Sequence, residues 1–130
     1  MHRNYLVVAA FFGALGVALG AFGAHGLQKI TSDEKVLHGY QTAVLYQLFH
    51  VLALTVVAII YEKFSNNLVK WAGSCFITGI LLFSGSLYLL TFLEVQGSNL
   101  VRYVGPLTPL GGIFLIAGWL FLLMGVARKK

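Results

Sequence analysis

Four long stretches of this sequence contain no Asp, Glu, Lys or Arg, and they constrain the fold more than any other feature. A helix needs about 20 apolar residues to cross the hydrocarbon core of a bilayer, which is about 30 Å thick. All 13 charged residues of the 130-residue chain lie outside these stretches. The sequence therefore predicts four transmembrane helices. The stretches have 20, 20, 23 and 18 residues and cover residues 5–24, 42–61, 71–93 and 110–127.

Composition excludes the soluble and the disordered classes of protein. Hydrophobic residues make up 58% of the chain and charged residues 10%, whereas charged residues are about 25% of a soluble domain. So few charges could not cover a water-facing surface, which argues against a soluble domain and a nucleic-acid partner despite the net charge of +5. The many aliphatic and aromatic side chains argue against disorder. We expect one all-α integral membrane domain over residues 1–130.

The predicted domain is a four-transmembrane-helix bundle rather than a barrel. Barrel strands alternate apolar and polar residues, and the run from Tyr5 to Phe12 does not. Thr31, with Glu34 three residues later, resembles a capping box that opens the second helix. Thr108 followed by Pro109 predicts a capped start for the fourth helix. The expected helices are 5–25, 34–61, 69–93 and 109–127.

Basic residues predict the orientation of the bundle. Cytoplasmic loops carry an excess of Lys and Arg, and six of the nine basic residues fall on the side that holds both termini. We therefore expect both termini in the cytoplasm. The six are Arg3, Lys63, Lys70, Arg128, Lys129 and Lys130, and the opposite side has Lys29, Lys35 and Arg102.

Two sets of glycines predict close helix packing. Small residues let helix backbones approach each other in lipid, where no hydrophobic effect acts between helices. In the first helix the spacing of three and four residues places the glycines on one face, and in the fourth they recur every seven residues. Two interpretations remain open: packing within one bundle, or contact between identical subunits in a homo-oligomer. The glycines are Gly13, Gly16, Gly20 and Gly23, then Gly111, Gly118 and Gly125.

Uncharged polar side chains within the spans are the candidate functional residues, because polar groups are costly in hydrocarbon. His50 lies near the middle of its span, and Tyr46 and Gln47 share its face four and three residues earlier, respectively. With polar residues of the other helices they are expected to converge in the outer half of the bundle as a candidate ligand-binding cluster. The cluster comprises His25, Gln41, Tyr46, Gln47, His50, Ser84, Ser86 and Tyr88.

Three roles are open for His50: a neutral imidazole that links helices, a ligand contact, or proton transfer. His25 is expected to close the first helix, with Gly26 in the left-handed conformation. Haem held by both histidines would require the chain at His25 to dip inward, because His50 lies about 15 Å deeper. The histidine spacing matches no zinc pattern, and no carboxylate lies inside a span. We therefore expect no metal, no cofactor and no enzymatic activity.

Four sequence blocks resemble those of a bacterial family of small membrane proteins classed as a domain of unknown function, similar to the staphylococcal membrane stabilising protein A. The blocks are GAFGAHGL (20–27), TAVLYQLFH (42–50), FSGSLY (83–88) and GPLTPLGG (105–112). The resemblance implies a multi-pass protein of the bacterial inner (plasma) membrane with no established activity, linked in staphylococci to membrane integrity. It also implies recurrent polar positions, which fall here on His25, Tyr46, Gln47, His50, Ser84 and Ser86.

Two hypotheses follow for function. The first is a non-enzymatic membrane protein that supports envelope integrity through helix packing or through binding of membrane lipids or a partner. The alternative is a binding protein or transporter for a small hydrophobic ligand, a quinone or haem, with its pocket around His50.

The orientation can be tested with a cysteine introduced at Ser98, in the third predicted loop. If both termini are cytoplasmic, this loop is external. A membrane-impermeant thiol reagent should then label Ser98→Cys in intact cells. Labelling only after lysis would reverse the orientation.

Overall fold

The structure is a computed structural model that describes residues 1–128, in which all regular elements are helical. Four helical segments are long and apolar enough to cross a membrane, which confirms the predicted all-α fold with four spans: Arg3–Ile30, Glu34–Ile60, Asn67–Gln96 and Val101–Ala127. Lys129 and Lys130, two of the basic residues on the predicted cytoplasmic side, lie outside the described residues. The elements are α1 (Arg3–His25), α2 (Leu27–Ile30), α3 (Glu34–Ile60), α4 (Asn67–Gly79), the π-helical segment η1 (Ile80–Ser84), α5 (Gly85–Gln96), α6 (Val101–Val104) and α7 (Leu107–Ala127).

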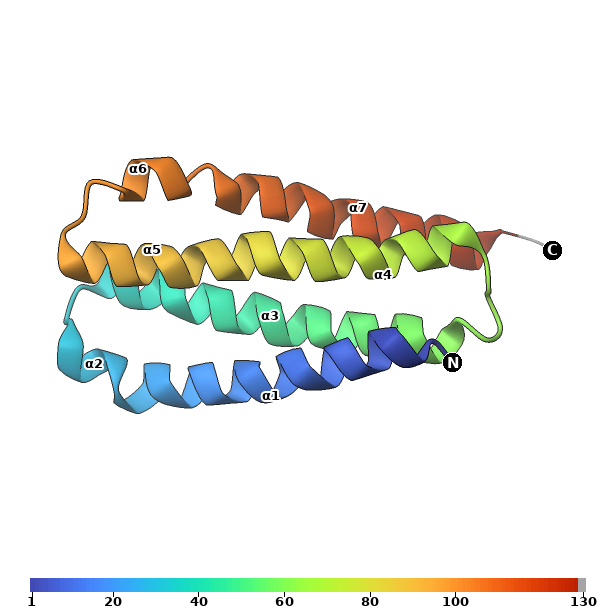
Figure 1. Cartoon of the computed structure of the whole chain (residues 1–130), viewed down its shortest axis with the longest axis horizontal. Helices are drawn as coiled ribbons and strands as arrows, with labels where there is room; N and C mark the ends of the chain where they lie inside the picture. The colour runs from blue at the N-terminus through green and yellow to red at the C-terminus, as the bar shows by residue number, and fades with distance from the viewer. Residues whose placement is uncertain (129–130) are drawn as a thin grey trace.

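The four spans lie side by side in chain order, each antiparallel to the next (Figure 1). α1 packs on α3, α3 packs on α4, η1 and α5, and α7 packs on α4 and η1. The start of α1 and the end of α7 are at one end of the molecule, and the short helices α2 and α6 are at the other. The third span, formed by α4, η1 and α5, is therefore the element on which both α3 and α7 rest.

The apolar core lies toward the end of the molecule that carries the start of α1. Leu54, Val57, Val69 and Phe76 are fully buried there between α3 and α4. Tyr5 joins α1 to this core, because its hydroxyl donates to the Lys70 carbonyl at 2.6 Å. The two most extensive helix–helix contacts, α1 with α3 and α4 with α7, are thus connected through one buried apolar cluster.

The predicted caps of two helices are wrong, although α3 begins at Glu34 as predicted. The N-cap of α3 is Asp33, whose carboxylate accepts the Lys35 N–H at 3.0 Å, while the Thr31 hydroxyl accepts the Asp33 N–H at 3.2 Å. α7 begins at Leu107, so Thr108 lies within its first turn and forms no cap. Its hydroxyl is instead 2.6 Å from that of Ser86 on α5, a tertiary contact that the local sequence does not reveal.

The first and third spans also differ from their predicted ends. Gly26 has φ −84°, in the right-handed helical region, so the expected left-handed residue after His25 is absent. The Gly26 N–H bonds to the Phe22 carbonyl at 2.7 Å and the chain continues into α2. α4 begins at Asn67, two residues before the predicted start, because the Asn66 side chain accepts the Val69 N–H and caps it.

Both sets of glycines face helices of the same chain. A Cβ at Gly16 would meet the Leu48 side chain of α3 at 2.7 Å, and one at Gly118 would meet the Phe76 ring of α4 at the same distance. Gly13, Gly20 and Gly23 likewise face Val51, Val44 and Tyr40 of α3, and Gly111 and Gly125 face Phe83 and Val69. A homo-oligomer of this chain therefore requires a surface other than these two glycine faces.

The turn of π-helix at Ile80–Ser84 interrupts the third span near its middle. The Gly85 N–H bonds to the carbonyl of Ile80, five residues earlier. Isolated π turns of this kind occur within α-helices and change the direction of the side chains around them. Here the turn places its backbone directly against Gly111 of α7, where a Cβ would collide with the backbone of Leu82 and Phe83.

The adjacent glycines of α7 provide a test of this contact. Gly111→Ala should destabilise the fold by about 1–3 kcal/mol, because the new methyl group meets backbone that cannot rotate away. Gly112→Ala should be neutral or stabilising by up to about 1 kcal/mol, because its Cβ has room beside Phe83 and alanine favours the helix. The measurement is unfolding by SDS titration in mild detergent. Equal effects of the two substitutions would contradict the packing of α7 on η1.

Candidate functional site

Gln47 connects three of the four spans. Its side chain is 2% exposed. The Nε2 group donates to the Phe12 carbonyl of α1 at 2.8 Å, and Oε1 accepts the Tyr88 hydroxyl of α5 at 2.6 Å. Hydrogen bonds of this kind hold helices together in lipid, where an unpaired amide is costly. Gln47 is therefore a structural link between α1, α3 and α5.

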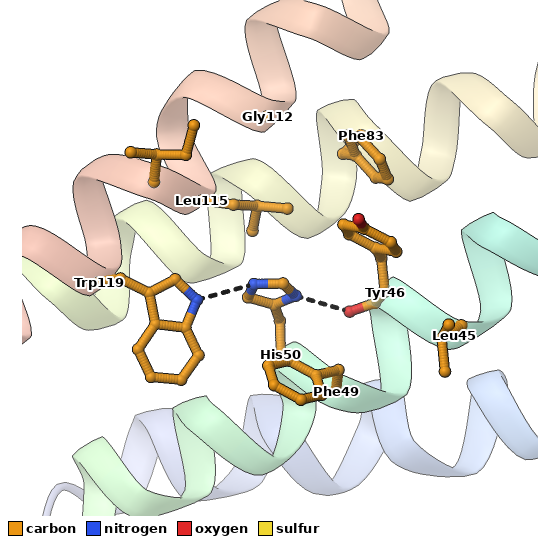
Figure 2. Close-up of a pocket in the computed structure, with 9 residues that line it drawn as sticks. Leu45, Tyr46, Phe49, His50, Phe83, Gly112, Leu115 and Trp119 are labelled. Atoms are coloured by element: carbon orange, nitrogen blue, oxygen red, sulfur yellow. Dashed lines mark hydrogen bonds between the residues drawn. The ribbon is translucent and has the colours of Figure 1, made fainter.

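His50 forms the corresponding link between α3 and α7. Its Nδ1 is 2.8 Å from the Tyr46 carbonyl, and because a carbonyl only accepts, Nδ1 carries the proton. Nε2 is then the acceptor for the indole N–H of Trp119 at 3.0 Å, as Figure 2 shows. Nδ1 therefore carries a proton and the lone pair of Nε2 accepts the indole N–H, so neither nitrogen of this neutral imidazole is free to coordinate a metal.

Ser84, the last residue of the π turn, and Ser86, two residues later, bond to different helices. Ser84, which is 1% exposed, donates to the Ala43 carbonyl of α3 at 2.7 Å. Ser86 is bonded to Thr108 at 2.6 Å and donates to the Phe83 carbonyl at 2.9 Å. Ser84 therefore fixes the third span against α3, and Ser86 fixes it against the start of α7.

The predicted cluster of eight polar residues is divided in the structure. Gln47, His50, Ser84, Ser86 and Tyr88 lie in hydrogen bonds between helices or within them. The side chains of the other three are exposed and form no hydrogen bond within residues 1–128: His25 at the end of α1, and Gln41 and Tyr46 on α3. Within the same residues, no group of three or more His, Cys, Asp or Glu side chains could hold a metal ion.

A groove of about 710 Å³ lies between α3 and α7, beside His50. Phe83, the second-last residue of η1, contributes to its inner wall (Figure 2). Leu45, Phe49 and Ile116 at its margin are 63%, 57% and 62% exposed, so the groove opens laterally toward the surrounding lipid. Its principal lining residues are Leu45, Tyr46, Phe49, Phe83, Leu115 and Trp119.

The walls of the groove are apolar and aromatic. The Tyr46 ring stacks on Phe83 with centroids 4.7 Å apart, and the Trp119 ring packs near Phe49 and His50 with centroids at 6.0 and 5.9 Å. The His50 and Trp119 nitrogens bond to each other, so they present little polarity to the groove. The Tyr46 hydroxyl remains as a side-chain donor with no partner in the described part of the chain.

Sequence reasoning located His50 and Tyr46 but missed the residues opposite them. Phe49, Phe83 and Leu115 carry no distinguishing pattern, because aromatic and aliphatic residues fill every span. Trp119 does carry one. Tryptophans of membrane proteins are enriched at the membrane interfaces, whereas Trp119 lies near the middle of α7, twelve residues after Leu107 and eight before Ala127. An indole N–H at that depth requires a buried acceptor, and His50 provides it.

Comparisons with known proteins identify a family with no assigned activity. The family model described as "Protein of unknown function (DUF423)" matches residues 19–112. A UPF0382 membrane protein of Schizosaccharomyces pombe is 44% identical over 119 residues, which cover 90% of this chain and 96% of that protein. UPF0382 membrane proteins of Haemophilus influenzae and Staphylococcus haemolyticus are each 39% identical, with 100% and 97% of this chain covered and 98% and 97% of those proteins. No solved structure matches the chain.

The two glutamines of α3 test the role of Gln47. Gln47→Leu should lower the free energy of unfolding by about 1–2 kcal/mol, because it leaves the Tyr88 hydroxyl without its acceptor. Gln41→Leu, at an exposed position with no bonded partner, should change it by less than about 0.5 kcal/mol. SDS titration of both variants measures the difference. A Gln47 variant as stable as the Gln41 variant would show that the bond between the three spans contributes nothing.

Proposed function

The chain belongs to the DUF423 family of proteins of unknown function, and we propose that it is a non-enzymatic membrane protein that binds a lipid-soluble molecule between α3 and α7. The groove carries this proposal. Its volume of about 710 Å³ falls within the range of about 300–1,000 Å³ that small-molecule sites occupy. Such sites are lined mostly by hydrophobic and aromatic side chains, as this one is.

The polarity of the groove supports an apolar ligand. The His50 and Trp119 nitrogens satisfy each other at 3.0 Å, and the other wall residues are hydrocarbon or aromatic apart from Tyr46. A charged or strongly polar ligand would lose its hydration and gain few hydrogen bonds in return. A molecule dissolved in the bilayer loses nothing of this kind, and it can enter sideways past Leu45 and Ile116.

We also propose a role in membrane integrity, which the position of the ligand would support. Within the described residues, the bond from Trp119 to His50 is the side-chain hydrogen bond that joins α3 to α7. A bound lipid would fill the space beside this bond and add apolar contacts to both helices. The protein and its lipid would then form one unit with fewer gaps than the helices alone.

The proposal includes a location and an orientation. We place the chain in the bacterial inner membrane with both termini in the cytoplasm. The basic residues Arg3, Lys63, Lys70 and Arg128 support this orientation, because they share the end at which α1 begins and α7 ends.

Between the two small ligands considered from the sequence, the geometry favours a quinone over haem. A haem held by His25 and His50 would need a ring nitrogen with a free lone pair on each histidine. Both nitrogens of His50 are bonded, and His25 lies exposed at the far end of α1. A quinone needs no such ligand, and its hydrocarbon chain and flat ring suit the apolar and aromatic walls of the groove.

Photolabelling of the groove, with and without a side chain that occupies it, tests the proposal. A photoactivatable alkyl diazirine, dissolved in vesicles that contain the protein, should label peptides of the groove more than other lipid-facing peptides. Gly112→Leu should reduce this labelling about tenfold, because its side chain extends beside Phe83 into the space.

The matched control is Gly39→Leu, because Gly39 also has open space around it and lies outside the groove. It should leave labelling of the groove unchanged. Even labelling of all lipid-facing helices, in the wild type and in both variants, would overturn the proposal.

A further inference from the structure

Tyr46 differs from the other tyrosines within the spans. The hydroxyls of Tyr5, Tyr40 and Tyr88 donate to the Lys70 carbonyl, the Leu19 carbonyl and Gln47 Oε1, respectively. The Tyr46 hydroxyl has no such partner in the described residues. Tyr46 lines the groove between α3 and α7, so this hydroxyl belongs to a side chain of the groove wall. Tyr46 is 41% exposed.

The depth of Tyr46 makes this unpaired hydroxyl costly. It lies twelve residues after Glu34 and fourteen before Ile60 on α3, which is about 18 and 21 Å from the two ends of the helix. Phe83 is also near the middle of its span, and Trp119 is near the middle of α7. Water and the ester oxygens of phospholipids lie outside a hydrocarbon core about 30 Å thick. An ordinary acyl chain would therefore fill the groove and leave the hydroxyl unsatisfied.

The rings around Tyr46 indicate what else the ligand contains. Tyr46 and Phe83 stack with an interplanar angle of 26°, and Phe49 and Trp119 are inclined at 52° on the other side of His50. Flat rings gain about 0.5–1.5 kcal/mol from offset or edge-on contacts with such neighbours, beyond their buried area. A flexible alkyl chain gains nothing specific from them.

We propose that the groove selects a lipid-soluble molecule with a flat ring and a carbonyl or hydroxyl oxygen, the chemistry of an isoprenoid quinone, and that Tyr46 donates a hydrogen bond to this oxygen. This inference rests on the proposed function, since it names the ligand class of the same groove. It concerns binding only and includes no redox step. Tyr46 acts as the residue that determines specificity, and the aromatic wall orients the ring.

Competition between two probes of equal chain length tests the inference. Decylbenzoquinone and decylbenzene, which lacks oxygen, are each added to vesicles in which the alkyl diazirine labels the groove. In the wild type the quinone should displace the label at a concentration about three- to tenfold lower than decylbenzene, the range expected for one hydrogen bond in a membrane protein. Tyr46→Phe keeps the ring and removes the hydroxyl, so it should abolish this difference and leave displacement by decylbenzene unchanged.

The control variant is Tyr103→Phe, which removes an exposed hydroxyl on α6, away from the groove. It should retain the preference for the quinone. Equal displacement by both probes in the wild type would overturn the inference while leaving the proposed function intact, because the groove would still be labelled. A preference that survives Tyr46→Phe would also overturn it. Absence of groove labelling before any competitor is added would instead overturn the proposed function.

Discussion

The structure depends on how polar side chains are satisfied where no water is available. In lipid the hydrophobic effect does not draw helices together, so they associate through close packing and interhelical hydrogen bonds. Gln47 supplies such bonds from α3 to both α1 and α5, and His50 supplies one from α3 to α7. α3 is therefore bonded to every other span through two residues less than one helical turn apart. Positions of the outer helices follow from these bonds and from the glycines that let their backbones approach.

Much of the fold could be predicted from the sequence because charge is excluded from hydrocarbon. The four uncharged stretches located the spans, and glycine spacing identified the faces of α1 and α7 that meet other helices. The ends were less accurate, since a cap depends on geometry at one or two residues. Asp33, rather than Thr31, accepts the N–H at the start of α3, and both are typical cap residues. No sequence pattern indicated the π turn, whose backbone lies against Gly111 of α7, a contact between residues far apart in the sequence.

The candidate site could be predicted only in part, because spacing along one helix does not show which neighbour each side chain meets. Tyr46 and Gln47 are adjacent in sequence, yet the first is 41% exposed and the second 2%. Their roles follow from the neighbours: Gln47 points at α1 and α5, and Tyr46 faces the open side toward α7. The polar residues of the sequence identified α3 and the two turns of it that contribute to the site. It could not separate residues that hold the fold together from a residue with an unused hydrogen bond.

The hydrogen bonds of His50 explain how the groove beside it can exclude water and still select between ligands. The proton on Nδ1 is committed to the Tyr46 carbonyl, which leaves Nε2 as an acceptor, and Trp119 is the donor that occupies it. The two residues with the strongest polar groups in the groove therefore neutralise each other's hydrogen-bonding capacity and contribute mainly their ring faces. A water molecule in the groove would find too few hydrogen-bond partners, because a buried water typically makes about three hydrogen bonds. Among the described lining residues, the Tyr46 hydroxyl is the donor left without a partner. In an otherwise apolar wall a single hydrogen bond from it distinguishes ligands that have an oxygen at that depth from those that do not.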